Sequence, residues 1–258
     1  MRILAVPAAF LLALCLYLPL PRAGEWLYAA LRRLYALFLR AFTRKSGQAD
    51  ETPALVTCAL VLGGVLMLLS ALHPAAAAVL MAPAFTGLCV LPGCAGAKDT
   101  LDSGTYAGNI PAYESLVRET CASLAPAFVG GIAAPLLLCA VGTPLHLGPS
   151  LGMAHALARA LAPHQTACAR IINALDGIVE RIFCAFMVLC SCVVGRNPFR
   201  TGGHGAEGRL LSILGIAGDR TDTHAPMAGD IPQGIVLCGF SAFLLCFLLC
   251  ALCFPFCR

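Results

Sequence analysis

Charged side chains are scarce in this sequence. Asp, Glu, Lys and Arg make up 12% of its 258 residues, whereas soluble domains carry about 25%. Hydrophobic residues account for 59%, and the mean hydropathy is +0.85. A soluble fold would have to bury almost the whole chain. The composition therefore predicts an all-α, polytopic helical membrane protein, located in the cell (inner or cytoplasmic) membrane with the lipid bilayer as its surroundings.

Several recurrent motifs are absent as well. The sequence contains no G-x-x-x-x-G-K-[ST] phosphate loop, no H-E-x-x-H and no G-x-S-x-G nucleophile turn. It also lacks a basic patch interleaved with aromatic residues, so we expect no nucleic-acid partner. The net charge of +4 is modest and is typical of Arg and Lys in the cytoplasmic loops of a membrane protein.

Cysteine, in contrast, is abundant, with fifteen residues. Most of them lie in apolar runs, where Cys behaves as a small hydrophobic residue. Cys246, Cys250, Cys253 and Cys257 recur at helical spacing and include a C-x-x-C. No His or polar loop accompanies these thiols, so we expect no metal site there.

The apolar runs predict four to six membrane spans in a single domain. The candidate spans cover roughly residues 3–20, 54–72, 75–92, 124–147, 182–194 and 234–254, with polar loops at 93–113 and 195–233. The first run resembles a signal peptide. Pro19 and Pro21 follow it, however, and no small-x-small cleavage site does, so we interpret it as a retained span.

Residues 25–45 predict a basic amphipathic helix. The chain supplies five basic residues here, and apolar residues recur at a spacing of three and four. Two interpretations remain open: the helix lies in the plane of the lipid headgroups, or its apolar face packs on the protein itself. Both place it on the cytoplasmic side. The apolar positions are Trp26, Leu27, Leu31, Leu34, Tyr35, Phe38 and Phe42, and the basic ones are Arg32, Arg33, Arg40, Arg44 and Lys45.

The segment from Val117 to Leu145 is apolar after Glu119 but is interrupted by two clusters of helix-breaking residues. Gly130, Gly131 and Pro135 form the first, and Gly142 and Pro144 the second. Unwound backbone at membrane depth is tolerated only where protein or a water-filled cavity surrounds it. We therefore expect broken or re-entrant helices that line a site. The alternative is a plain span that Gly and Pro merely kink.

Five short stretches occur in an order that matches a known family. They are V-R-E-T-C-A at 117–122, G-G-I-A-A-P-L at 130–136, G-T-P-L at 142–145, C-A-R-I-I-N-A-L-D-G-I-V-E-R at 168–181 and E-G-R-L-L-S-I-L-G-I at 207–216. In order and spacing they resemble the adenosylcobinamide-phosphate synthase family of cobalamin biosynthesis, and the resemblance is collinear over nearly the whole chain.

The resemblance implies ATP-dependent amide-bond formation. The substrates would be a corrinoid, adenosylcobyric acid, and a small amine, aminopropanol or its phosphate, with ATP and Mg²⁺ as the implied cofactors. Such a ligation needs cations against phosphates, acids for Mg²⁺ and a base for the amine. The catalytic candidates are Glu119, Glu207 and Asp176, and the substrate-binding candidates are Arg118, Arg170, Arg181, Arg209 and His204.

We expect Glu119, Arg118, Arg170, Arg181 and Glu207 to converge near the interrupted segment, since each flanks an apolar stretch. For each residue alone, the alternative is an Arg or Glu that only snorkels at a membrane boundary. His204, in G-G-H-G, has the alternative of a solvated loop residue.

Departures from the family pattern leave further alternatives open. Most family residues replaced in this chain are acids or amides. The first alternative is a catalytically impaired protein on the same scaffold that binds a corrinoid or a partner. The second is an unrelated small membrane transporter. The replacing residues are Ser123, Leu124, Gly130, Ile172 and Asn173.

Overall fold

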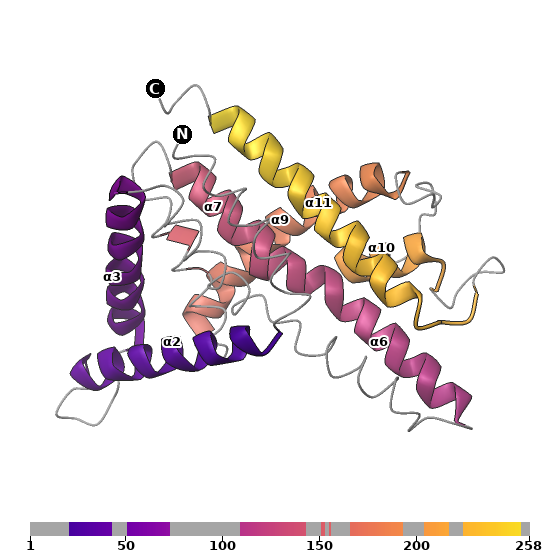
Figure 1. Cartoon of the computed structure of the whole chain (residues 1–258), viewed down its shortest axis with the longest axis horizontal. Coiled ribbons are helices and arrows are strands. Elements are labelled where there is room, and N and C mark those ends of the chain that lie inside the picture. Colours follow the sequence, from indigo (N-terminus) through magenta and orange to yellow (C-terminus); the bar gives the residue numbers. More distant parts are fainter. Residues whose placement is uncertain are drawn as a thin grey trace. The chain divides into compact units, whose positions relative to one another are not determined.

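The structure is a computed structural model that describes residues 21–42, 51–72, 109–142, 151–152, 155, 166–192, 204–216 and 224–253. All regular secondary structure in these ranges is helical (Figure 1), which confirms the expected all-α class. The labelled elements are α2 (Pro21–Phe42), α3 (Glu51–Leu72), α6 (Ile110–Phe128), η2 (Val129–Ala133), α7 (Ala134–Gly142), α9 (Thr166–Ser191), α10 (Gly205–Leu214) and α11 (Asp230–Cys253).

Two helices in the described part of the chain are long and apolar enough to cross a membrane. They are Ile110–Gly142, with 33 residues, and Asp230–Leu249, with 20 residues. The apolar stretch Pro53–Val65 in α3 is shorter. The predicted spans at 3–20 and 75–92 lie outside the described residues. Apolar helices of membrane-spanning length therefore overlap two of the predicted spans, 124–147 and 234–254.

Three boundaries differ from the prediction. Helix α6 begins at Ile110 inside the predicted loop 93–113, because the side chain of Asn109 accepts a hydrogen bond from the backbone N–H of Ala112 at 3.3 Å and Pro111 suits the first turn. Helix α10 and the start of α11 lie inside the predicted loop 195–233, and the predicted span 182–194 is the later part of α9. Polar composition concealed the starts of α10 and α11.

The first Gly and Pro cluster widens the helix and does not unwind it. The backbone is helical from Ile110 to Gly142, with a π-helical turn at Val129–Ala133. Pro135 has no N–H to donate and its ring would clash with the carbonyl of Gly131 in a regular α-helix, while glycine permits local backbone adjustment. The expected break is thus a π-helical turn, a feature frequent at functional sites. Of the second cluster, Gly142 is the last residue of α7, and Pro144 lies outside the described residues.

The chain divides into two compact units, which are described separately. The first unit comprises residues 1–90, 130–177 and 246–258, and the second comprises residues 91–129 and 178–245.

In the first unit, α2 and α3 pack through one cluster. Tyr35 of α2 is buried with small side chains of α3, and small residues let two helices approach closely. The apolar stripe of α2 therefore packs on the protein, as one of the two interpretations predicts. The cluster contains Tyr35, Ala54, Leu55, Cys58, Ala59 and Ile172, with Leu34, Phe38, Leu39, Phe42 and Leu62 partly buried against it.

Also in the first unit, Gly152 approaches the backbone of α7. A Cβ atom at this position would lie 2.8 Å from the carbonyl oxygen of Pro135 and would collide with the sulfur of Cys139. In the second unit, Gly234 of α11 has a similar role, since its added Cβ would lie 2.9 Å from Cδ1 of Leu124 in α6. The first contact needs glycine because it meets backbone, whereas the Leu124 side chain at the second could shift.

We expect Gly152→Ala to destabilise the protein by about 1–3 kcal/mol, the usual cost of overpacking a core, because the carbonyl of Pro135 belongs to the backbone and cannot move aside. The matched control is Gly177→Ala in the same unit, where an added Cβ meets nothing within 4 Å and alanine favours the helix. Thermal unfolding in detergent should separate the two variants by several degrees. Equal melting temperatures would contradict the close approach.

Candidate functional site

The N-terminus of α10 is bound by a carboxylate from α9. Oε1 of Glu180 accepts a hydrogen bond from the backbone N–H of Ala206. His204 occupies the N-cap position, but its side chain makes no capping hydrogen bond. Gly205 has φ +76°, and a Cβ there would lie 2.7 Å from Oε1 of Glu180. Glu180 thus satisfies a helix-terminal donor and places a negative charge at the positive end of the helix dipole.

The C-terminus of α10 ends in a Schellman motif. Gly215 has φ +81°, its N–H donates to the carbonyl of Ser212 at 3.2 Å, and the N–H of Ile216 donates to the carbonyl of Leu211 at 3.0 Å. Nη2 of Arg118 in α6 donates to the carbonyl of Ile216 at 3.1 Å. This end of α10 is therefore fixed to α6 by a charged side chain.

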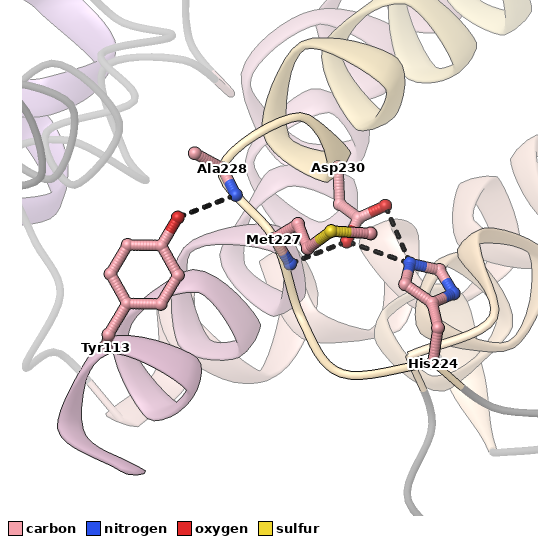
Figure 2. Close-up of polar contacts among 5 residues, drawn as sticks. All are labelled: Tyr113, His224, Met227, Ala228 and Asp230. Atoms are coloured by element: carbon pink, nitrogen blue, oxygen red, sulfur yellow. Dashed lines mark hydrogen bonds and ion pairs between the residues drawn. The ribbon is translucent and has the colours of Figure 1, made fainter. Parts of the chain in front are cut away.

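A histidine–aspartate pair lies beside this end of α10 (Figure 2). Nε2 of His224 lies 3.1 Å from both carboxylate oxygens of Asp230. The Asp230 side chain is 3% exposed and that of His224 is 31% exposed. The backbone N–H of His224 donates to the carbonyl of Gly215 at 3.0 Å, so the Schellman motif also positions the histidine.

Further hydrogen bonds hold the segment that carries this pair. The backbone N–H of Met227 donates to Oδ2 of Asp230 at 2.9 Å, and the N–H of Ala228 donates to the hydroxyl of Tyr113 in α6 at 3.0 Å (Figure 2). Asp230 is also the first residue of α11, where the helix dipole favours an anion. The carboxylate is thus buried with hydrogen-bond donors around it.

The pair borders an open pocket with a volume of about 310 Å³, lined by His224, Met227, Gly229, Asp230 and Gln233. A carboxylate accepts hydrogen bonds, so Nε2 of His224 carries the proton in the neutral ring and Nδ1 is the acceptor. This is the arrangement of a histidine base oriented by an aspartate. The pocket and the pair together form the candidate site, which we call the His224 pocket.

The first unit contains a second pair. Nε2 of His155 lies 2.9 Å from Oδ1 of Asp176, with the two side chains 2% and 15% exposed. Nδ1 of His155 is buried and has no hydrogen-bond partner in the described part of the chain. Asp176, a predicted catalytic residue, therefore holds a buried histidine.

The predicted site residues divide between the two units. Arg170 and Asp176 belong to the first unit, and the other six belong to the second. Within the second unit, His204 and Glu207 lie at the N-terminal end of α10, and Arg181 follows Glu180, which binds that end. Arg118 reaches the C-terminal end. A ten-residue helix is about 15 Å long, so these residues gather at two ends of α10.

The remaining predicted residues have individual surroundings. Glu119 is exposed and accepts a hydrogen bond from the hydroxyl of Ser115 at 3.0 Å. Glu207 and Arg181 are exposed, and Arg209 is partly buried. In the part of the chain that the structure describes, no group of three or more His, Cys, Asp or Glu side chains is close enough to share a metal ion.

Sequence reasoning did not select Glu180, Tyr113, His224 or Asp230. An acid at the start of an apolar run, as in Asp230, is a helix-start signal. The pairing of Asp230 with His224 depends on the turn between them, which the sequence does not specify. No protein-family model, curated protein or solved structure matches this chain, so the chemistry of the site follows from its own geometry.

We expect Glu180→Ala to destabilise the protein by about 1–2 kcal/mol, the usual cost of losing an N-terminal helix cap. Glu207→Ala is the matched control, because Glu207 is an exposed acid in the first turn of the same helix and contributes only about 0.3–1 kcal/mol through the helix dipole. Thermal or denaturant unfolding measures both. An equal or larger loss for Glu207→Ala would contradict the capping role of Glu180.

Proposed function

We propose that this protein is a divergent membrane enzyme of corrinoid assembly that forms an amide bond between an amine and a corrinoid carboxylate with the use of ATP. The observation that carries the proposal is the His224–Asp230 pair beside an open pocket. It supplies the base that such a ligation requires. The order of the sequence motifs and the two membrane-length helices support the same reaction class.

The base has a defined task in this reaction. ATP would activate the carboxylate by phosphorylation with release of ADP, so that attack of the amine nitrogen on the carboxyl carbon would break the bond from that carbon to the phosphate oxygen and release phosphate. The attacking nitrogen must lose a proton as the amide forms. Nδ1 of His224 accepts that proton, and the buried carboxylate of Asp230 stabilises the resulting imidazolium.

The other roles fall to residues of the second unit. Mg²⁺ is usually held by one or two carboxylates together with substrate phosphates. Glu119 on α6 and Glu207 in the first turn of α10 are exposed acids and are separate candidates for that role. Arg181 and Arg209 are the cations for phosphate groups. Arg118 donates one N–H to Ile216, so its role is to position the end of α10.

One observation favours a second candidate, the catalytically impaired scaffold that binds a corrinoid or a partner. Glu180, an acid next to the predicted site residue Arg181, accepts a hydrogen bond from the N-terminus of α10. Its carboxylate therefore stabilises the fold and is not free to bind a substrate or Mg²⁺. On this scaffold the His224 pocket would hold a polar group of the bound molecule without proton transfer.

A complementation test decides between the two candidates. The wild-type protein should restore corrinoid assembly in a strain that lacks the synthase, and His224→Ala and Asp230→Asn should abolish it, since a positioned base contributes about 10²–10⁴-fold in rate. Cys192→Ala, an exposed position at the end of α9, is the control. Membrane fractions should contain all variants in equal amounts.

Failure of the wild type to complement would overturn the enzyme proposal and favour the binding scaffold. Complementation by the wild type together with full activity of His224→Ala would instead overturn the role of the pair. Formation of the amide by purified protein, followed by chromatography, checks the base directly, because His224→Ala should slow the reaction while the wild type forms the product.

A further inference from the structure

Helix α2 presents a second, exposed face. The later part of its apolar stripe packs on α3, and on the opposite face Arg33, Leu37 and Arg40 recur at positions i, i+4 and i+7. All three are exposed, Leu37 by 61%. Arg32 flanks them and is exposed too. We call Arg33, Leu37 and Arg40 the basic face of α2.

The charge of this face is uncompensated along the helix. The sequence contains no Asp or Glu between Trp26 and Ala49, while it contains five basic residues between Arg32 and Lys45. Ion pairs between neighbouring turns therefore cannot neutralise the arginines. Such a face fits an anionic surface, and the exposed leucine between the arginines fits an apolar layer beneath that surface.

Helix α3 fixes where that surface lies. Its outer side chains Val56, Leu60, Val61, Val65 and Leu68 are 44–67% exposed and recur at helical spacing. A contiguous apolar face of this kind indicates a non-aqueous neighbour. The helix has 22 residues, about 33 Å, and its apolar stretch Pro53–Val65 begins at the end that contacts α2, so this end marks where the hydrocarbon layer begins.

The contact between the two helices lies near the start of α3, at Ala54, Leu55, Cys58 and Ala59. In Figure 1, α2 runs across one end of α3 and not along its length. If α3 crosses the bilayer, α2 lies at the level where hydrocarbon meets the headgroups. Its basic face then meets lipid phosphates.

We propose that the basic face of α2 binds the phosphate groups of anionic phospholipids in the bilayer. Arginine presents paired N–H donors that match phosphate oxygens, and Leu37 inserts among the acyl chains. The proposal concerns how the protein is held in its membrane and does not depend on the reaction at the His224 pocket.

The single tryptophan of the chain provides a local probe, because Trp26 lies in α2. The full chain is reconstituted in nanodiscs of phosphatidylcholine that contain a small fraction of lipid with a dansyl group on the acyl chain. The headgroup of the labelled lipid is either phosphatidylglycerol or phosphatidylcholine. Energy transfer from Trp26 should be larger for phosphatidylglycerol, and the preference should fall as salt is raised, because surface charges are screened.

In the variant Arg33→Gln/Arg40→Gln, the preference for phosphatidylglycerol over phosphatidylcholine should fall by about 25-fold. Each basic residue at an anionic surface contributes about fivefold, and two are removed. Arg33→Lys/Arg40→Lys should retain most of it, because the charge remains. The control Arg200→Gln/Arg220→Gln removes the same charge from the predicted loop 195–233 and should leave the preference unchanged. No preference in the wild type, or an equal loss in the control, overturns the proposal. Circular dichroism verifies that each variant is folded.

Discussion

The second unit depends on hydrogen bonds that hold carboxylates at helix starts. Glu180 binds the N-terminus of α10, and Asp230 begins α11 while accepting hydrogen bonds from His224 and Met227. Glu180 is half-buried, whereas Asp230 is buried, and a buried carboxylate without donors would cost several kcal/mol. The donors to Asp230 therefore fix the turn before α11. The position of His224 follows from the same requirement.

The sequence predicted the helical class and the apolar cores of α6–α7 and α11 because long apolar runs depend only on composition. It placed α10 in a loop, since Gly205 and Gly215 act through backbone geometry that a polar stretch conceals, whereas Asn109 and Pro111 are a recognisable start signal for α6. It selected Asp176 but not its partner His155, because 21 residues of chain separate them. Pairs of this kind depend on tertiary packing, which single-sequence patterns do not encode.

The amphipathic helix α2 has two faces with different neighbours. Its apolar stripe predicted either a lipid surface or packing on the protein. The structure places that stripe against α3, which leaves Leu37 as the large apolar side chain on the opposite, basic face. A helix held by its own protein need not insert deeply, so the arginines can stay at the depth of the phosphates. The two interpretations thus apply to different faces of α2.

Packing also accounts for three of the departures from the family pattern. Ile172 belongs to the cluster of α2 and α3, Leu124 is fully buried and contacts Gly234, and Gly130 lies buried in the π-helical turn. An acid or amide at any of these positions would have to be desolvated among apolar side chains. The polar side chains of the pattern that the chain resembles therefore do not fit this packing. Among the acids that the structure describes, Asp230 lies at the polar start of α11, where it orients His224.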